Sequence, residues 1–474
     1  MSTSLTALRQ KLSQVAQVDV LRFLDSLDDT GKKKLTSQLD ALDLDNIAEL
    51  VQTQVKTKAA IALPKDIKPV QAFPHPSKAN ADQRTQYAAA EKRGRELLKV
   101  GKVAAFLVAG GQGTRLGYDG PKGEFPVTPI KHKPLFQVFA EQLLAHSRDA
   151  GKSIPWYIMT SDANDAATRA FFAKNNYFGY PKADVFFFQQ GMMPAFAMDG
   201  KMLLAAKDSL ALSPDGHGGS LRALDKSGAL ADMKKRGVEH LSYFQVDNPL
   251  VHTIDPLFLG LHDTTGSEMS SKTIPKVGPL EKVGNFVIGD GALQVIEYSD
   301  LPEQLAQQTN ADGSLKFNSG SIAIHALRVS FIERLNTGGR LSLPWHRAEK
   351  KVPFVDASGK EVKPDKPNAV KLEQFVFDAI PLAKNPIVFT TDRAEEFSPV
   401  KNAEGVDSPA TSKRDQVRRA ARWLPFAGVD VPTKGENPDA TIEISPTFAT
   451  SAEQLKTRSI RNLEIGSGQD VFLE

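Results

Sequence analysis

The chain has 474 residues, with 59 lysines and arginines against 56 aspartates and glutamates, and a formal net charge of +3. This small excess gives no argument for binding nucleic acid or an anionic membrane surface. Cysteine is absent, which excludes disulfides, thiolate nucleophiles and cysteine-ligated metals. The first twelve residues lack the apolar core of a signal peptide, and no run approaches the ~18 apolar residues of a membrane span. We therefore expect a cytoplasmic protein with no membrane partner.

The first hundred residues are expected to form a helical region followed by a linker. Leu5, Leu8 and Leu12 recur at helical spacing, and the same periodicity continues to about residue 60. Residues 61–80 are rich in proline and have little periodicity, which indicates an extended connector. A charged helix is expected over residues 82–100.

An apolar run from Val103 to Ala109 predicts a buried strand of a parallel sheet. It is followed by a glycine-rich loop that extends to Gly123 and contains Arg115 and Lys122. Such a loop at the carboxyl edge of a parallel sheet is a usual place for anionic ligands, because glycines let backbone N–H groups approach phosphate oxygens. The two cationic side chains would add positive charge.

Two common phosphate-binding loops do not fit this stretch. A dinucleotide fingerprint starting at Gly111 would need a glycine where Leu116 stands, which disfavours an NAD oxidoreductase. A P-loop would need serine or threonine after its lysine, but Gly123 follows Lys122. A plain glycine turn is the structural alternative, and the arginine and lysine within so short a span argue against it.

Strands and helices alternate after the loop, which is typical of a doubly wound α/β layer. The pattern predicts a helix over 134–150, a strand over 154–159, a helix over 163–174 with Thr160-Ser161-Asp162 as its N-cap, and strands over 184–188 and 241–246. Beyond residue 439 the chain alternates in places, which predicts a small β-rich C-terminal piece.

Asp247 follows the strand that is expected over 241–246. A carboxylate at this end of a strand is well placed for Mg²⁺, which takes one or two carboxylates together with substrate phosphates. A cap or turn role is the ordinary alternative for a lone aspartate. The sequence offers no dense cluster of His, Asp and Glu elsewhere, so a separate metal cage is not expected.

The loop from Ala109 to Gly117, followed by Pro121 to Gly123, resembles the signature A-G-G-x-G-T-R-L-G and P-K-G of the eukaryote-type UDP-N-acetylglucosamine pyrophosphorylases, a UDP-sugar uridylyltransferase family (UDPGP type 1). Further motifs of this family recur to about Asn402. The resemblance implies an α/β fold with a Rossmann-like nucleotide-diphospho-sugar transferase domain over 101–392 and a mixed, mostly parallel sheet. It also implies an N-terminal helical appendage with its linker over 1–100 and a small β-rich C-terminal domain over 393–474.

The nucleotide side of the site is likewise implied by the resemblance. Gln190 stands where the family binds the uracil edge, for which an amide that both donates and accepts is suited, although a surface glutamine is the ordinary alternative. Lys371 and Lys401 lie in stretches similar to K-x-E-x-F-V-F-D and F-S-P-L-K-N, which approach the phosphates in the family. The implied catalytic residues are Arg115, Lys122 and Lys401, and the implied nucleotide-binding residues are Val108, Ala109, Gly110, Gly111, Gln190, Gly216, Asp247 and Lys371.

The sugar side departs from the family in two places. His217 replaces the asparagine of P-D-G-N-G-G, and Ser321 replaces the second asparagine of F-N-A-G-N-I-A. Gly284 and Glu297 match the family, in which the glutamate accepts hydrogen bonds from sugar hydroxyls. A loop histidine and a structural salt bridge are the ordinary alternatives for His217 and Glu297. The identity of the sugar therefore stays open.

The resemblance implies that UTP and a sugar 1-phosphate give a UDP-sugar, above all UDP-N-acetylglucosamine or another UDP-N-acetylhexosamine, and pyrophosphate, with Mg²⁺ (or Mn²⁺) at Asp247. A UDP-glucose or broad-specificity UDP-sugar pyrophosphorylase is the alternative within the fold, and a non-catalytic nucleotide-sugar binding protein is the alternative from another class. A monomer or weak homo-oligomer is expected, but the sequence does not give the oligomeric state.

Overall fold

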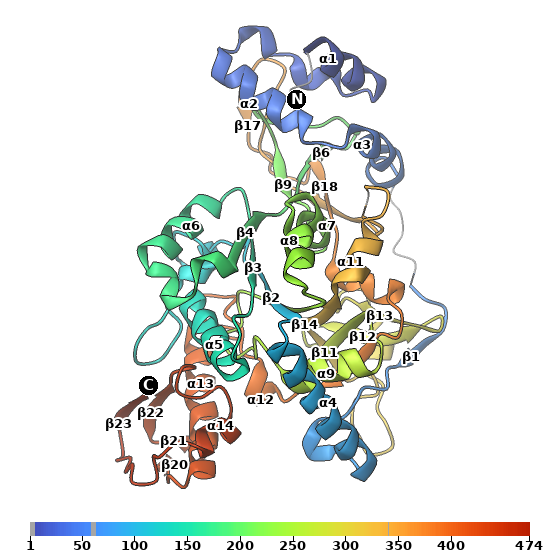
Figure 1. Ribbon diagram of the computed structural model, residues 1–474. Helices are drawn as coiled ribbons and strands as arrows, with labels where there is room; N and C mark the ends of the chain where they lie inside the picture. Colours follow the sequence, from blue (N-terminus) through green and yellow to red (C-terminus); the bar gives the residue numbers. More distant parts are fainter. Residues whose placement is uncertain (1–4, 58–62, 340) are drawn as a thin grey trace. The chain divides into compact units, whose positions relative to one another are not determined.

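The structure is a computed structural model, and it describes residues 5–57, 63–339 and 341–474. The chain divides into two compact units, each of which gathers segments that are far apart in the sequence (Figure 1). Unit 1 comprises Met1–Leu63, Gln190–Arg222 and Leu341–Asp378, and unit 2 comprises Pro64–Gln189, Ala223–Arg340 and Ala379–Glu474. The three-domain scheme expected from the sequence stays a prediction.

Unit 2 is built on a ten-stranded sheet in the order β1-β12-β14-β10-β2-β3-β4, with β11, β13 and β19 paired alongside. Its strands are β1 (Ile67–Pro69), β2 (Val103–Val108), β3 (Trp156–Thr160), β4 (Val185–Gln189), β10 (His240–Gln245), β11 (Met269–Pro275), β12 (Gly284–Gly289), β13 (Ala292–Ile296), β14 (Ser319–Arg328) and β19 (Ile387–Thr390). The strands predicted over 154–159, 184–188 and 241–246 are confirmed as β3, β4 and β10.

The expectation of a mostly parallel sheet is wrong. Among the described strands, four pairs are parallel: β10/β2, β2/β3, β3/β4 and β11/β19. Five pairs are antiparallel: β1/β12, β12/β13, β12/β14, β10/β14 and β11/β14. Asp290 and Gly291 have φ of +48° and +86° and join β12 to β13 in a two-residue turn. An Asp-Gly pair favours such a hairpin, because both positions need positive φ.

The helices of unit 2 are α4 (Ala81–Lys99), α5 (Leu135–Ala150), α6 (Asp165–Lys174), α8 (Ala229–Arg236), α9 (Pro256–Thr264), α10 (Glu303–Ala306), α11 (Val329–Leu335) and α12 (Arg393–Glu396), and α7 (Gly219–Lys226) crosses between the units. Ala105 and Leu107 of β2 lie in a core shared with α4, α5 and α9. Phe106 faces the other way and packs against Tyr243 and Phe188, with ring centroids 5.2 and 5.8 Å away.

Helices α4 and α9 lie side by side and touch through their backbones (Figure 1). A Cβ atom on Gly94 would overlap the carbonyl oxygen of Pro256, and one on Gly260 would overlap that of Ala90. Only glycine fits at either position, because a Cβ atom has a fixed place and the carbonyl oxygen that it would overlap belongs to the backbone.

The helices predicted over 134–150 and 82–100 are confirmed as α5 and α4. The N-cap predicted at Thr160-Ser161-Asp162 is wrong, because α6 begins at Asp165 with Asn164 as its N-cap residue. The Asn164 side chain does not cap the helix but accepts a hydrogen bond from the Ser161 N–H at 2.8 Å. The preceding residues are thus held in a turn.

The C-terminal part of unit 2 contains α13 (Pro409–Trp423), α14 (Ala452–Lys456), β20 (Thr433–Lys434), β21 (Asn437–Pro438), β22 (Ala440–Ile444) and β23 (Gln469–Leu473). The strand expected in this tail is present as β22, which pairs in parallel with β23. Beyond residue 439 the strands β22 and β23 outweigh the short helix α14. The stretch 393–474 as a whole is not β-rich, because α13 is its longest element and supplies Ala420 and Trp423 to its core.

Unit 1 contains α1 (Leu5–Gln14), α2 (Asp29–Asp40), α3 (Leu44–Leu50) and short strands β5 (Met192–Pro194), β6 (Phe196–Ala197), β7 (Leu204–Ala206), β8 (Ser209–Leu210), β9 (Leu212–Pro214), β15 (His346–Lys350), β16 (Phe354–Val355), β17 (Glu361–Val362) and β18 (Ala369–Glu373). The predicted N-terminal helices are confirmed within residues 5–57, and the expectation for 58–60 lies outside the described residues. Leu12 and Leu35 share one core with Phe196, Leu204 and Leu372.

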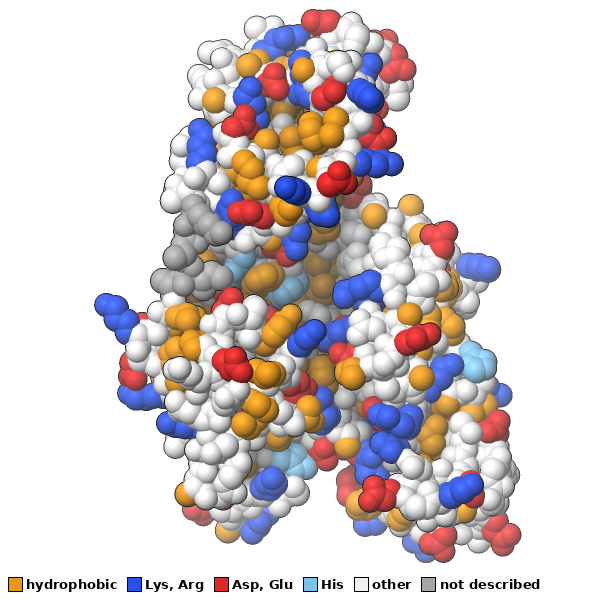
Figure 2. Space-filling model, turned by 180° about the vertical axis from the view of Figure 1, so that it is seen from behind, with side chains coloured by type: hydrophobic (Ala, Val, Ile, Leu, Met, Phe, Trp, Pro, Cys, Tyr) orange, Lys and Arg blue, Asp and Glu red, His pale blue; other side chains and the backbone are white. Residues whose placement is uncertain are grey.

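No helix within the described ranges is long and apolar enough to cross a membrane. On the face drawn in Figure 2, acidic and basic side chains are interspersed. This agrees with the near balance of charges in the sequence.

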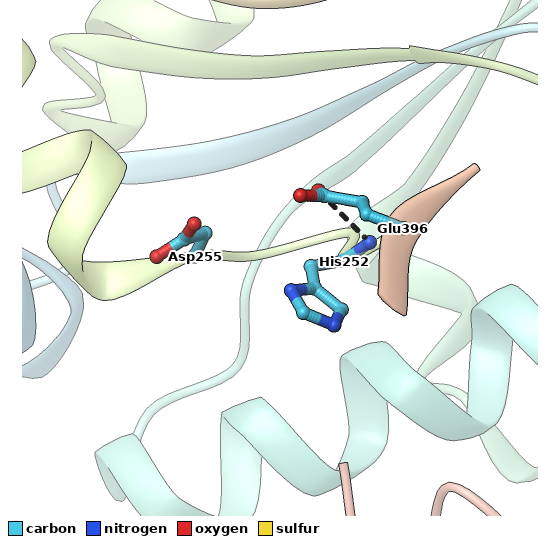
Figure 3. Close-up of side chains that lie close together, drawn as sticks. All are labelled: His252, Asp255 and Glu396. Carbon is cyan, nitrogen blue, oxygen red and sulfur yellow. Dashed lines mark hydrogen bonds between the residues drawn. The ribbon is translucent and has the colours of Figure 1, made fainter. Parts of the chain in front are cut away.

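An ion network surrounds the buried side chain of Lys272, which belongs to β11 of the sheet of unit 2. Glu396, Asp255 and His252 lie close together, and the His252 backbone N–H donates to Glu396 (Figure 3). The ammonium of Lys272, which is 1% exposed, lies 2.6 Å from Asp255 Oδ2 and 2.7 Å from both oxygens of Glu396. Although the trio has the composition of a metal site, its carboxylates already surround the charge of Lys272.

We expect Lys272→Met to lower the free energy of unfolding by about 3–5 kcal/mol, because the fully buried carboxylate of Glu396 and the partly buried carboxylate of Asp255 would lose their counter-ion. Lys34→Met, which breaks an exposed pair with Asp208, should cost at most about 1 kcal/mol. Chemical denaturation of both variants measures the difference, and equal losses would contradict the role of the network.

Buried histidines make the stability of the fold sensitive to acid. Burial lowers the pKa of His146, His217 and His240 to about 4, and it lowers the pKa of His262 well below its ordinary value. Below about pH 6.5 the unfolded chain binds protons at these positions that the folded chain does not. Burial raises the pKa of the Asp215 carboxyl to about 7, and it also raises the pKa of the Glu124 and Asp407 carboxyls. These three groups work in the opposite direction, but the histidines whose pKa burial lowers, His252 included, outnumber them.

We therefore expect the free energy of unfolding to fall as the pH falls from about 6.5 towards about 4.5, by at most about 1.4 kcal/mol per pH unit for each histidine. Denaturation curves recorded at several pH values measure this slope. His240→Leu should reduce the slope, whereas His132→Asn, at an exposed histidine, should leave it unchanged. A slope that is the same in all three proteins would contradict the assignment.

Candidate functional site

The parallel strands β10, β2, β3 and β4 end at the same level. Val108 lies opposite Gln245 and Met159, and Thr160 lies opposite Gln189. The predicted residues Val108 to Gly111, Asp247 and Gln190 therefore directly continue the carboxyl ends of neighbouring strands. This edge is where α/β sheets usually bind ligands.

Backbone hydrogen bonds join the two ends of the glycine loop that follows β2. Gly113 N–H donates to Gly120 O at 2.9 Å, and Lys122 N–H donates to Gly111 O at 3.1 Å. The N–H groups of Gly110 and Gly111 have no acceptor among the described residues, and a Cβ on Gly111 would meet nothing within 4 Å. The loop thus presents N–H donors without acceptors among the described residues, as an anion site requires.

Asn164 holds the glycine loop from behind. It is 1% exposed, and its Nδ2 donates to Ala109 O at 2.9 Å and to Gly111 O at 3.3 Å. Its position before α6 gave no signal for this role in the sequence, because asparagine is common at helix starts. The loop is therefore fixed by a residue that the motif does not contain.

Four of the predicted residues come together around Lys122, which is 7% exposed. Burial lowers the pKa of the Lys122 ammonium, Asp247 acts to raise it, and Arg115 and Lys401 lower it further. Three cations are thus close enough to repel one another, with Asp247 among them and Asp407 4.0 Å from the ammonium of Lys401. Such an arrangement favours a ligand of high negative charge.

Asp247 fits the requirements of a hard divalent cation. A second carboxylate, Asp407, is close by: burial raises the pKa of Asp407, Lys401 lowers it and Asp247 raises it. Lys401 N–H donates to Asp407 O at 2.7 Å. One or two carboxylates beside phosphate-binding cations are the donor set that Mg²⁺ prefers. Asp407 was not predicted from the sequence, because it lies beyond the matched motif.

The predicted sugar-binding residues of unit 2 also come together. Gly284 of β12 pairs with Ser321 of β14. A Cβ on Gly284 would lie 3.3 Å from Glu297 Oε1 and 3.6 Å from the Ser321 Cβ. The three residues therefore line one patch of the sheet.

In unit 1, the second glycine loop packs against the segment that follows β18. Gly216 has φ of +87°, and a Cβ there would overlap the carbonyl oxygen of Gln374. Gly218 N–H donates to that oxygen at 2.8 Å, and Asp215 N–H donates to Gly191 O at 3.1 Å. These contacts bring Gly216, His217 and the neighbourhoods of Gln190 and Lys371 together within this unit.

His217 is held in one orientation. Its Nδ1 accepts a hydrogen bond from Val376 N–H at 3.0 Å, and its ring stacks on Phe375 with centroids 5.2 Å apart. Burial lowers its pKa to about 4, so the ring is neutral near pH 7. Because Nδ1 accepts, the single ring proton must lie on Nε2. His217 can therefore only donate a hydrogen bond at its other nitrogen, whereas an asparagine could donate and accept.

A small cavity of about 40 Å³ lies elsewhere in unit 2, lined among others by Gln142, His252, Arg419 and Glu443. None of the predicted site residues lines it.

A family model described as UTP--glucose-1-phosphate uridylyltransferase (UDPGP) matches residues 48–407. UDP-N-acetylhexosamine pyrophosphorylase-like protein 1 of Homo sapiens is 35% identical over 94% of this chain and 93% of its own length. UDP-N-acetylglucosamine pyrophosphorylase of Saccharomyces cerevisiae is 39% identical over 76% of this chain and 77% of its own.

A solved structure of the uridine diphosphate N-acetylglucosamine pyrophosphorylase from Trypanosoma brucei is also similar, with a TM-score of 0.83 and 26% identity over 98% of this chain and 97% of that one. The resemblance seen in the sequence is thereby confirmed. The chain belongs to the UDPGP family of UTP–sugar-1-phosphate uridylyltransferases, the enzymes that make UDP-sugars.

Proposed function

We propose that this protein makes a UDP-N-acetylhexosamine, such as UDP-N-acetylglucosamine, and pyrophosphate from UTP and the corresponding sugar 1-phosphate. The observation that carries the proposal is the convergence of Lys122, Arg115, Lys401 and Asp247 beside the glycine loop. The names of the similar proteins from Homo sapiens and Saccharomyces cerevisiae support the choice of sugar class.

The proposed reaction needs alignment and charge, but no side-chain nucleophile. A phosphate oxygen of the sugar 1-phosphate attacks the α-phosphorus of UTP in line, the new P–O bond forms, and the bond to the β-phosphate oxygen breaks as pyrophosphate leaves. Lys122, Arg115 and the free N–H groups of the glycine loop stabilise the charge that moves onto the leaving group. Lys401 orients the incoming sugar phosphate. Gln190, Gly216 and Lys371 bind the nucleotide.

The proposal includes Mg²⁺ (or Mn²⁺) bound by Asp247. When bound, the ion would screen the repulsion between the anionic reactants. Asp247 and Asp407 supply carboxylate oxygens that fit it. Burial raises the pKa of Asp407, and the nearby carboxylate of Asp247 adds to the rise, so a cation between the two would relieve their repulsion.

A broad-specificity UDP-sugar pyrophosphorylase is a second candidate. It is favoured by His217 and Ser321, which replace both asparagines expected on the sugar side. His217 offers only a donor, and Ser321 leaves more space beside Gly284 than an asparagine would.

The test is pyrophosphate release from UTP and Mg²⁺ with N-acetylglucosamine, N-acetylgalactosamine, glucose and galactose 1-phosphates. We expect the N-acetylhexosamine 1-phosphates to give the highest kcat/KM, and Lys122→Ala to lower kcat about 100-fold or more because a buried cation at the leaving group is lost. Lys99→Ala, at an exposed lysine, is the control and should retain activity. No release with any sugar would point to a non-catalytic binding protein.

We expect His217→Asn to raise kcat/KM for N-acetylhexosamine 1-phosphates relative to hexose 1-phosphates, because an amide can accept as well as donate. The same substrate panel measures the ratio, and His132→Asn serves as the matched control. Identical ratios in His217→Asn and wild type would show that this position does not select the sugar.

A further inference from the structure

The segments that carry Asp247 and Lys401 are far apart in the chain but are joined by their backbones. Val400 N–H donates to Asp247 O at 2.7 Å. Since Lys401 is the next residue, its distance from Asp247 depends on this contact. The two residues are therefore placed as a pair.

The side chain of Asn248 joins the same two segments. Its Nδ2 donates to Glu396 O at 2.8 Å, and its Oδ1 accepts from Ser398 N–H at 3.1 Å and from Leu250 N–H at 3.3 Å. Asn248 is 5% exposed. Because its partners are donors on one side and an acceptor on the other, the buried amide has only one orientation that satisfies them.

The segment from Glu396 to Val400 is itself firmly anchored. Glu396 is fully buried and binds Lys272, and Thr391 Oγ1 donates to its Oε2 at 2.7 Å. Ser412 Oγ donates to Ser398 O at 3.0 Å. Asn248 thus transmits the rigidity of a buried ion network to the residue next to it, Asp247.

We infer that Asn248 is a positioning residue, whose side chain fixes the spacing between the metal-binding carboxylate of Asp247 and the phosphate-binding ammonium of Lys401. Its catalytic consequence rests on the proposed function. Asn248 acts through its two neighbours, since all three of its bonds are made to backbone groups.

The first test compares Asn248→Ala with Asn336→Ala. Asn336 is also buried (8% exposed), and its Nδ2 donates to Ile332 O at 2.9 Å, but it lies at the end of α11. We expect Asn248→Ala to lower kcat for pyrophosphate release at least about tenfold, because small misplacements of reacting groups are costly, with a smaller change in KM for UTP. Asn336→Ala should retain the wild-type kcat even where both variants lose stability.

The second test does not depend on activity. Amide hydrogen exchange at Ser398 and Val400 should become about tenfold faster in Asn248→Ala, because the contact between the segments opens more often, and it should be unchanged in Asn336→Ala.

Unchanged exchange at Val400 would overturn the inference, as would a wild-type kcat in Asn248→Ala. Failure of the wild-type protein to release pyrophosphate with any sugar would instead refute the proposed function, and hydrogen exchange would then decide the inference alone.

Discussion

The site depends on one constraint: the neighbouring parallel strands β10 and β2 end at paired residues. With Val108 fixed opposite Gln245, the glycine loop and the Asp247 loop must emerge side by side from the sheet. The pairing of the two strands therefore fixes the distance between the two loops. The third contributor, Lys401, arrives from a distant segment and is brought to the same place because the preceding residue, Val400, donates its N–H to Asp247 O.

This arrangement stores electrostatic repulsion in the free protein. Burial lowers the pKa of Lys122, Asp247 opposes this, and Arg115 and Lys401 lower the pKa further. A polyphosphate offsets this repulsion when it binds. Relief of the repulsion between the like charges, which were brought together during folding, therefore contributes to affinity and to stabilisation of a transition state. The buried amides of Asn164 and Asn248 resist the relaxation of the loops that such repulsion would otherwise cause.

Much of the parallel half of the sheet could be predicted from sequence, since β2, β3, β4 and β10 are short apolar runs that each end in a distinctive loop. The antiparallel half could not, because β12 and β14 pair across distances that periodicity does not reveal, although Asp290-Gly291 was a usable hairpin signal. The motif residues around Lys122 could be predicted as separate stretches of sequence. Their convergence is seen only in the structure, where Asp247, Arg115 and Lys401 each act on the pKa of Lys122. Asn164 and Asn248 were not predicted as site supports, because a single asparagine has many ordinary roles and only its buried partners distinguish it.

The contact between α4 and α9 has a further consequence. Gly94 and Gly260 each face a carbonyl oxygen of the opposite helix, so main-chain contacts set how closely the two helices approach. Rotamer changes cannot narrow this spacing, and the layer behind the sheet therefore behaves as an incompressible support. A larger residue at either glycine would therefore push the two helices apart, and the sheet strands that pack on them would lose their support.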